Sequence, residues 1–426
     1  MKTRLITTTL CVFLSAVAAP ALAQEGGESK APITDSSIPP GQSTITLDER
    51  SPLSTVQAVT SRFRAELKDP PADYDLADES FVVYVPQDYD GSEPYGLIVW
   101  ISPNPNGWPI YRYIPVLDKH KFIWIGANNS GNPRSFWHRA GLALDGLHHA
   151  TKHYNIDPMR TYISGLSGGG RCSSRIGLTY ADLFAGAYPI IGVDYFKRLP
   201  HPKTTDYKMV FWGPSFNPPT PDIMRRAKRD CRYVLLTGET DGNRPQTFVT
   251  YEYGFKRARF AFVTYLEVPG MGHTFPPADW FEKGVIALDA PLAEVRERRE
   301  TEAKRRLDRA LDRLQRSPPH GIEALEKLLK DYNDTTHAST AADYLARVKE
   351  DPNAFVINKP TTETPEEKPK PTLADRARED LALARNYLQA GRTDLATDLL
   401  TRIVEYYPDT EEAEQAGGLL EAMNTQ

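Results

Sequence analysis

Cysteine is scarce in this 426-residue chain, which contains only three. Cys11 lies in the apolar N-terminal segment, so Cys172 and Cys231 are the two that remain for a folded domain. We predict that they do not pair, because Cys172 falls near the start of a helical pattern and Cys231 just before a strand-like run. No spacing of cysteine and histidine matches a metal site, and we expect no bound metal.

Long apolar runs are absent beyond the N-terminus. There, Lys2 and Arg4 precede the run "LITTTLCVFLSAVAAPA", and "ALA" at 21–23 has the pattern of a cleavage site before Gln24. These features predict a signal peptide over 1–23 and an exported protein, periplasmic or secreted. The alternative, a membrane anchor, is disfavoured because the run is short and ends at the cleavage site. No later segment reaches the ~18 apolar residues of a membrane span, so we expect no transmembrane segment.

An excess of basic charge is also lacking. The formal net charge is −5 and the sequence pI is about 6.0, which argues against a general nucleic-acid binder. Hydrophobic residues make up 40% and charged residues 25%, as in globular proteins. The 35 prolines indicate extended loops and linkers.

Strand-like and helical patterns alternate after residue 80. Most of the strand-like runs are continuous and β-branched or aromatic, as expected for strands buried on both faces. They are 81–86, 96–102, 122–128, 161–165, 186–193, 232–238 and 260–268, and the helical patterns are 135–154, 170–184, 221–230, 246–259 and 278–290. This alternation predicts an α/β domain over 75–290, with a mostly parallel sheet and helices on both faces.

The segment before this domain, 24–74, is predicted to be a leader with one helix. Residues 24–47 are polar and rich in Gly, Ser and Pro, and are predicted to be loose. The run 51–67 is predicted to be a helix capped by Ser51.

The C-terminal third changes character. We predict a charged, solvated helix followed by a helical hairpin over 291–350, a Pro-rich linker over 351–372 and a second helical unit over 373–426. "ALEKLLKDYNDTTHASTAADYLARV" (324–348) matches "LLTRIVEYYPDTEEAEQAGGLLEAM" (399–423) position by position. With "ARNYLQAGRTDLA" before the second copy, the pattern resembles the tetratricopeptide repeat. The two copies could dock on the α/β domain or bind a protein partner.

Three consecutive glycines follow a strand-like run in "RTYISGLSGGGRCSSR". No Lys follows them, so the loop does not fit a Walker phosphate loop. Gly165 to Gly169 fit G-x-S-x-G between a strand and a helix, the nucleophile-elbow pattern. Ser167 is the predicted nucleophile, and the Gly168 N–H is the predicted oxyanion donor. A structural glycine turn is the alternative, and no role is evident for Gly170.

A serine nucleophile needs a base and an acid. Between the elbow and the helical tail only His201 and His273 occur, and His273 lies in the Gly-rich loop "VPGMGHTFPP" after the last predicted strand. We predict His273 as the base and His201 as a surface residue. The acid is predicted to be Asp241, after the penultimate strand, with Glu239 in reserve.

The second oxyanion donor is expected in the loop "ISPNPNGWP". Two prolines there lack an N–H, so we predict Asn104, with Asn106 or Gly107 as alternatives. The aromatic-rich insertion 195–221 is interpreted either as a cap over the site or as core. Candidate substrate-binding residues are Trp108, Trp137 and Trp212.

These residues, with "VYVPQDYDG", "NIDPMRTYISGLSGGG", "YADLFAGAYPIIG" and "VPGMGHTFPP", resemble the α/β-hydrolase superfamily. Within it they look like the polyhydroxybutyrate-depolymerase and feruloyl or acetyl-xylan esterase-like branch. The resemblance implies an exported serine hydrolase, without metal or cofactor, that cleaves carboxylic esters, polymeric or carbohydrate-linked esters included. The chain departs from that branch because "ISPNPNG" lacks a His-Gly pair. The alternatives are a serine peptidase on the same fold and an inactive hydrolase shell that binds partners through its repeats.

Overall fold

The structure is a computed structural model that describes residues 40–203, 208, 210–351, 373–389 and 393–424. The predicted signal peptide over 1–23 and linker residues 352–372 lie outside the described residues. The chain forms two compact units, Met1–Val356 and Ile357–Gln426. Among the helices that the structure describes, none has the length and apolar character to cross a membrane.

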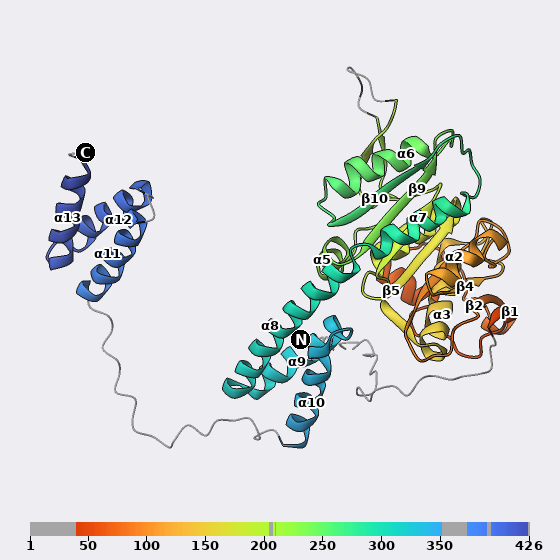
Figure 1. Cartoon of the computed structure of the whole chain (residues 1–426), viewed down its shortest axis with the longest axis horizontal. Coiled ribbons are helices and arrows are strands. Elements are labelled where there is room, and N and C mark those ends of the chain that lie inside the picture. The colour runs from red at the N-terminus through yellow and green to blue at the C-terminus, as the bar shows by residue number, and fades with distance from the viewer. Residues whose placement is uncertain (1–39, 204–207, 209, 352–372, 390–392, 425–426) are drawn as a thin grey trace, which may run out of the picture. The chain divides into compact units, whose positions relative to one another are not determined.

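The first unit is built on an eight-stranded sheet (Figure 1). Its strand order is β1-β2-β4-β3-β5-β6-β9-β10, and every pair from β4 to β10 is parallel. The strands are β1 (Gly41–Ile45), β2 (Phe81–Val85), β3 (Tyr95–Ile101), β4 (Phe122–Ala127), β5 (Ile156–Leu166), β6 (Gly186–Ile190), β9 (Arg232–Gly238) and β10 (Phe262–Val268). The predicted, mostly parallel sheet is confirmed.

Strand β1 corrects the prediction for the leader. Residues 24–47 were predicted to be loose, yet Gly41–Ile45 pair antiparallel with β2 at the sheet edge. The polar composition misled the prediction because an edge strand buries only alternate side chains and is stabilised by its ladder of backbone hydrogen bonds. Residues 24–39 lie outside the described part of the chain.

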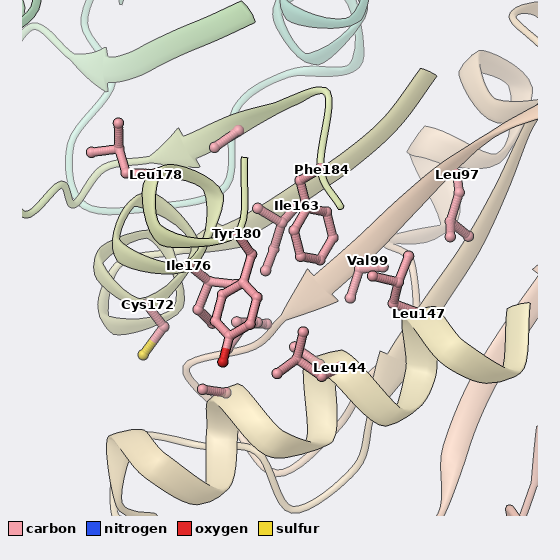
Figure 2. Packing of buried hydrophobic residues seen from close by; sticks show 14 of the residues in the cluster. Leu97, Val99, Leu144, Leu147, Ile163, Cys172, Ile176, Leu178, Tyr180 and Phe184 are labelled. Atoms are coloured by element: carbon pink, nitrogen blue, oxygen red, sulfur yellow. The ribbon is translucent and has the colours of Figure 1, made fainter. Parts of the chain in front are cut away.

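Helices cover both faces of the sheet, as predicted. One face packs against α1 (Val56–Phe63), α3 (Phe136–His153), α4 (Gly168–Thr179) and α5 (Pro221–Arg229), and the other against α2 (Ile114–Lys119) and α7 (Ala278–Asp289). Figure 2 shows Leu144 and Leu147 of α3 beside Val99 of β3, with Ile176 of α4 in the same cluster. Neighbouring residues of one strand face opposite layers, so strands buried on both faces read as continuous apolar runs.

Two helices differ from their predicted bounds. Helix α1 begins at Val56 and is capped by Thr55, whose hydroxyl accepts from the Ala58 N–H at 3.1 Å. The prediction of Ser51 as the cap was wrong, because the Ser51 hydroxyl accepts from the Leu53 N–H at 3.3 Å in a turn that precedes the helix. The pattern predicted over 246–259 forms α6 (Arg244–Val249) followed by the π-helix η3 (Thr250–Lys256).

Three further helices complete the first unit: α8 (Leu292–Arg316), α9 (Pro318–Tyr332) and α10 (Thr336–Glu350). The second unit contains α11 (Leu373–Gln389), α12 (Thr393–Tyr406) and α13 (Glu411–Asn424). Matched positions of the internal repeat are buried in the two cores: Leu325 with Leu400, Leu328 with Ile403 and Ala341 with Ala416. Both copies of the repeat therefore bury the same stripe of their helices.

Helix α8 joins the α/β part through buried charges. The Arg299 side chain is 2% exposed and pairs with Asp230, which precedes β9, at 3.3 Å. It also donates from Nε to Asp334, after α9, at 2.7 Å. Burial alone would raise the pKa of Asp230, but the hydrogen bond and charge of Arg229 and the charge of Arg299 outweigh it and hold that pKa below its usual value. The Arg299 guanidinium thus pairs with two carboxylates that the fold removes from water, and Asp230 also pairs with Arg229 and Arg298.

The first prediction concerns this contact. Arg299→Ala leaves the buried Asp334 side chain without its cation, whereas Asp230 keeps Arg229 and Arg298, so we expect the free energy of unfolding to fall by about 3–5 kcal/mol. The matched control is Arg305→Ala on the same helix, because the Arg305 side chain is 58% exposed. We expect this control to change the free energy of unfolding by less than about 0.5 kcal/mol. Urea unfolding of the three proteins measures both values, and equal midpoints would contradict the role of Arg299.

The second prediction concerns the thiols. Cys172 and Cys231 are unpaired and buried, and burial raises the pKa of the Cys231 thiol to about 11. Since the thiolate is the reactive form, we expect almost no reaction with Ellman's reagent in the native protein near pH 8. After denaturation without reductant, protein beginning at Gln24 should release two equivalents. Release only after reduction would show a disulfide.

Candidate active site

Ser167 stands at a strained turn between β5 and α4. Its backbone has φ 54° and ψ −115°, a conformation that side-chain-bearing residues rarely adopt. The Ser167 N–H donates to the carbonyl of Ile190 on β6 at 2.8 Å, and the Ser167 carbonyl accepts from the Arg171 N–H at 3.0 Å. The turn is therefore held on both sides by the neighbouring strand and by the helix it starts.

Close backbone approach explains the surrounding glycines. A Cβ on Gly165 would lie 2.5 Å from the carbonyl carbon of Gly169, where strand and helix meet. A Cβ on Gly169 would overlap the carbonyl oxygen of Ile101. Gly170, for which the sequence suggested no role, lies against Gly192: a Cβ there would be 2.5 Å from the Gly192 carbonyl oxygen. The glycine run therefore allows β3, β6 and α4 to converge beneath Ser167.

The sheet brings Ser167, His273 and Asp241 together. His273 Nε2 lies 2.8 Å from Ser167 Oγ, and His273 Nδ1 lies 3.0 Å from Asp241 Oδ2 and 3.2 Å from Oδ1. The three residues follow β5, β9 and β10, which are parallel, so their carboxyl ends share one edge of the sheet. The Asp241 side chain is fully buried and that of His273 is half exposed. This arrangement suits a serine hydroxyl that gives its proton to an imidazole oriented by a carboxylate.

Glu239, the reserve acid, has a different role in the structure. Its carboxylate is exposed and accepts from the Gly270 N–H at 2.8 Å, which joins the loops after β9 and β10. Asp241 instead accepts from the Asn243 N–H at 2.6 Å as well as facing His273. The two carboxylates differ because Glu239 leaves the strand toward solvent, whereas Asp241 lies where the loop turns back under the histidine.

Sequence reasoning missed Arg171, which links the serine helix to the loop of the acid. Its guanidinium donates to Asp194 at 2.8 Å, to Gln246 at 2.7 Å and to Asn243 at 3.2 Å. Asn243 in turn donates from Nδ2 to the Ile191 carbonyl at 2.8 Å. A signal was available, because a cation in the first turn of a helix faces the positive end of the dipole and requires acceptors.

The predicted oxyanion donors differ in whether their N–H groups are already hydrogen-bonded to the protein. Gly168 is the first residue of α4, where backbone N–H groups have no partner within the helix. The Asn104 N–H donates to Ser102 Oγ at 3.1 Å, and the N–H of the alternative Gly107 donates to Asn128 Oδ1 at 2.9 Å. Asn106, the other alternative, accepts from Ser102 Oγ through its side chain at 3.4 Å. The Asn104 N–H is thus used within its own loop, and the Gly107 N–H is used by Asn128, which follows β4.

The three candidate tryptophans differ in their packing. Trp137 on α3 meets Phe63 edge-on, with ring centroids 6.0 Å apart, and packs against the core. Trp212 on β8 (Phe211–Trp212) packs against His201 with the ring centroids 4.4 Å apart and the ring planes tilted by 53°. Packing accounts for both, whereas Trp108 is 52% exposed.

The insertion 195–221 contributes mainly to packing. Tyr195 and Phe196 are buried in the core, and β8 forms a two-stranded ribbon with β7 (Leu199–Pro200). Tyr207 lies outside the described residues. Of the two interpretations of this segment, the described part of it fits core and extra strand.

Comparison with solved structures finds distant likenesses, all with TM-scores below 0.5. No protein-family model matches the sequence, and no curated protein matches it. Similar solved structures include S-formylglutathione hydrolase FrmB from Staphylococcus aureus, 14% identical over 61% of this chain and 98% of that one, with a TM-score of 0.36. Est1E from Butyrivibrio proteoclasticus is 13% identical over 52% of this chain and 97% of that one, with a TM-score of 0.36.

A third similar structure is FphF, a fluorophosphonate-binding serine hydrolase of Staphylococcus aureus. It is 14% identical over 58% of this chain and 98% of that one, with a TM-score of 0.38. The parallel sheet from β4 to β10 and the serine turn after β5, with an acid and a histidine following β9 and β10, identify the α/β part of the first unit as an α/β-hydrolase fold.

Proposed function

We propose that this protein is a serine hydrolase that cleaves carboxylic esters through an acyl-enzyme. The observation that carries the proposal is the continuous hydrogen-bonded chain from Ser167 Oγ through His273 to Asp241. Serine is a weak nucleophile by itself, and this chain provides the base that activates it and the carboxylate that orients the base. Polar residues would rarely be held in this order at the carboxyl edge of a parallel sheet for packing alone.

The reaction then follows from the geometry. Ser167 Oγ attacks the ester carbonyl carbon while His273 Nε2 takes the hydroxyl proton, and the carbonyl oxygen becomes an anion. Asp241 stabilises the imidazolium. His273 then gives its proton to the leaving alcohol oxygen, and the C–O bond to that oxygen breaks to form the acyl-enzyme. A water molecule, deprotonated by His273, attacks the acyl carbon and releases the carboxylic acid and Ser167.

The oxyanion would form beside the N-terminus of α4. The Gly168 N–H supplies one donor there, and the helix dipole favours negative charge at the same place. The steps need no group beyond the side chains named and water.

Export and a partner are parts of the same proposal. The N-terminal pattern over 1–23 supports export to the periplasm or beyond, and the repeat-like helices of the second unit support binding of a protein partner. The intact Ser-His-Asp chain favours an active enzyme over an inactive shell. A peptidase would pass through the same intermediate, so a panel of aryl acetates, feruloyl esters, polyesters and peptides separates ester from amide substrates.

The third prediction tests the nucleophile. Protein beginning at Gln24 should be labelled at Ser167 by a fluorophosphonate probe, and Ser167→Ala should abolish the labelling because the attacking oxygen is gone. His273→Ala should lower the labelling rate at least a hundredfold, since the base contributes about 10²–10⁴-fold. Mass spectrometry of the labelled peptide identifies the site. A folded wild-type protein that the probe leaves unlabelled would refute the proposed function.

The fourth prediction separates the two acids. Asp241→Asn keeps the shape of the side chain but removes the charge that holds His273 in the active tautomer, so kcat for a small aryl ester should fall by about 10⁴-fold. Glu239→Gln, the matched control, should leave kcat within about twofold, because Glu239 contacts the Gly270 N–H and not His273. Steady-state kinetics measure both. A larger loss in Glu239→Gln than in Asp241→Asn would exchange their roles.

A further inference from the structure

Asn132 lies directly against the serine turn, although it is far from it in sequence. A Cβ built on Gly168 would overlap Asn132 Oδ1 and lie 2.8 Å from its Cγ and 3.2 Å from its Nδ2. The amide group of Asn132 therefore rests on the Cα of the residue whose N–H is proposed to face the oxyanion. The Asn132 side chain is exposed and makes no hydrogen bond to any residue that the structure describes. Its donor and acceptor are free for a ligand.

The loop that carries Asn132 is braced on both sides. The Asn132 N–H donates to the Pro103 carbonyl at 2.9 Å, and the neighbouring Gly131 packs closely on the backbone of Asn104. Arg134 donates to the buried Glu79 at 2.8 Å. The constrained backbone fixes the position of the Asn132 Cα beside the serine turn, so that only the side-chain torsions remain to be ordered when a ligand binds.

A second brace ties the same loop to the segment after β3. The buried Arg139 side chain donates from Nε to the Ser130 carbonyl at 2.8 Å and from a terminal nitrogen to the Ser102 carbonyl at 3.0 Å. Both loops are thereby fixed beside the serine turn, where a Cβ on Gly169 would meet the Ile101 carbonyl. Asn132 is held in place by α3, β3 and the serine turn together.

The chemistry of the site leaves a place for another donor. Oxyanion sites use preorganised donors aimed at the developing charge, and both backbone N–H groups and asparagine side chains serve. The N–H groups of Asn104 and Gly107 already donate to protein oxygens, and Pro103 and Pro105 have none. The two N–H groups of the Asn132 side-chain amide make no hydrogen bond to the residues that the structure describes. Rotation of the amide group exchanges the positions of its oxygen and nitrogen, so the nitrogen can face the oxyanion.

We propose that the Asn132 side chain is the second oxyanion donor, a role that rests on the proposed function. When Ser167 Oγ bonds to the substrate carbonyl carbon, the hydroxyl proton passes to His273 Nε2 and the π electrons of the C=O bond move to its oxygen. That oxygen then accepts one hydrogen bond from the Gly168 N–H and one from Asn132 Nδ2. As the intermediate collapses, the electrons return and both hydrogen bonds weaken.

The fifth prediction tests this role with two substitutions. Asn132→Ala removes the donor, and Asn132→Asp keeps the shape while it replaces the donor with a charge of the same sign as the oxyanion. We expect kcat for a small aryl ester to fall about 10²–10³-fold in both, with KM nearly unchanged, because the donor acts on the transition state. A trifluoromethyl ketone inhibitor, which forms an oxyanion with the serine, should bind more weakly by a similar factor.

The matched control is Asn333→Ala, an exposed asparagine after α9, which should keep both kcat and inhibitor affinity within about twofold. Thermal unfolding midpoints of all four proteins show whether a loss of kcat reflects unfolding. The Asn132 variants should have the same unfolding midpoint as the wild type. A folded Asn132→Ala variant with kcat within about threefold of an active wild type would overturn the role of Asn132 alone. A wild type that neither hydrolyses esters nor labels at Ser167 would instead refute the proposed function on which this role depends.

Discussion

The convergence of β3, β5, β6 and α4 beneath Ser167 is the constraint on which the rest of the site depends. Side chains at Gly165, Gly169 or Gly170 would force these backbones apart. Only with the backbones in contact can Ser167 hold a positive φ and place its hydroxyl at the sheet edge. The strain at one residue is offset by hydrogen bonds to Ile190 and Arg171 on either side.

The same convergence organises the surrounding polar groups. Asp241 and His273 reach Ser167 because parallel strands end at a common edge, and Arg171 connects the serine helix to the loop of the acid. Asn132 lies against Gly168 on a loop that Arg134 joins to the buried Glu79.

The two copies of the repeat lie in different compact units. Helices α8 to α10 belong to the first unit, which therefore includes the segment 291–350 that the sequence analysis assigned to a region of its own. Buried ion pairs between Arg299, Asp230 and Asp334 fix this attachment. Helices α11 to α13 form a unit with its own core and repeat the same buried stripe.

Local patterns in the sequence by themselves determined the alternating strands and helices, the glycine-rich turn at Ser167 and the matched stripes of the repeat. Each of these depends on the side chains of one short segment: runs that bury both faces, residues without a Cβ, or apolar positions at helical spacing. The meeting of serine, acid and histidine could also be expected, because the loops that follow parallel strands lie at one edge of the sheet.

Only the tertiary structure decided the pairing of β1, the orientation of Asp241 rather than Glu239 toward His273, and the proximity of Asn132 to Gly168. These features join segments separated by tens of residues, and their energy comes from contacts that exist only after the chain has folded. The polar residues concerned resemble ordinary loop residues in the sequence, since asparagine and aspartate are common in turns whatever they contact. Their roles follow from position in space, which the packing of the glycine turn sets.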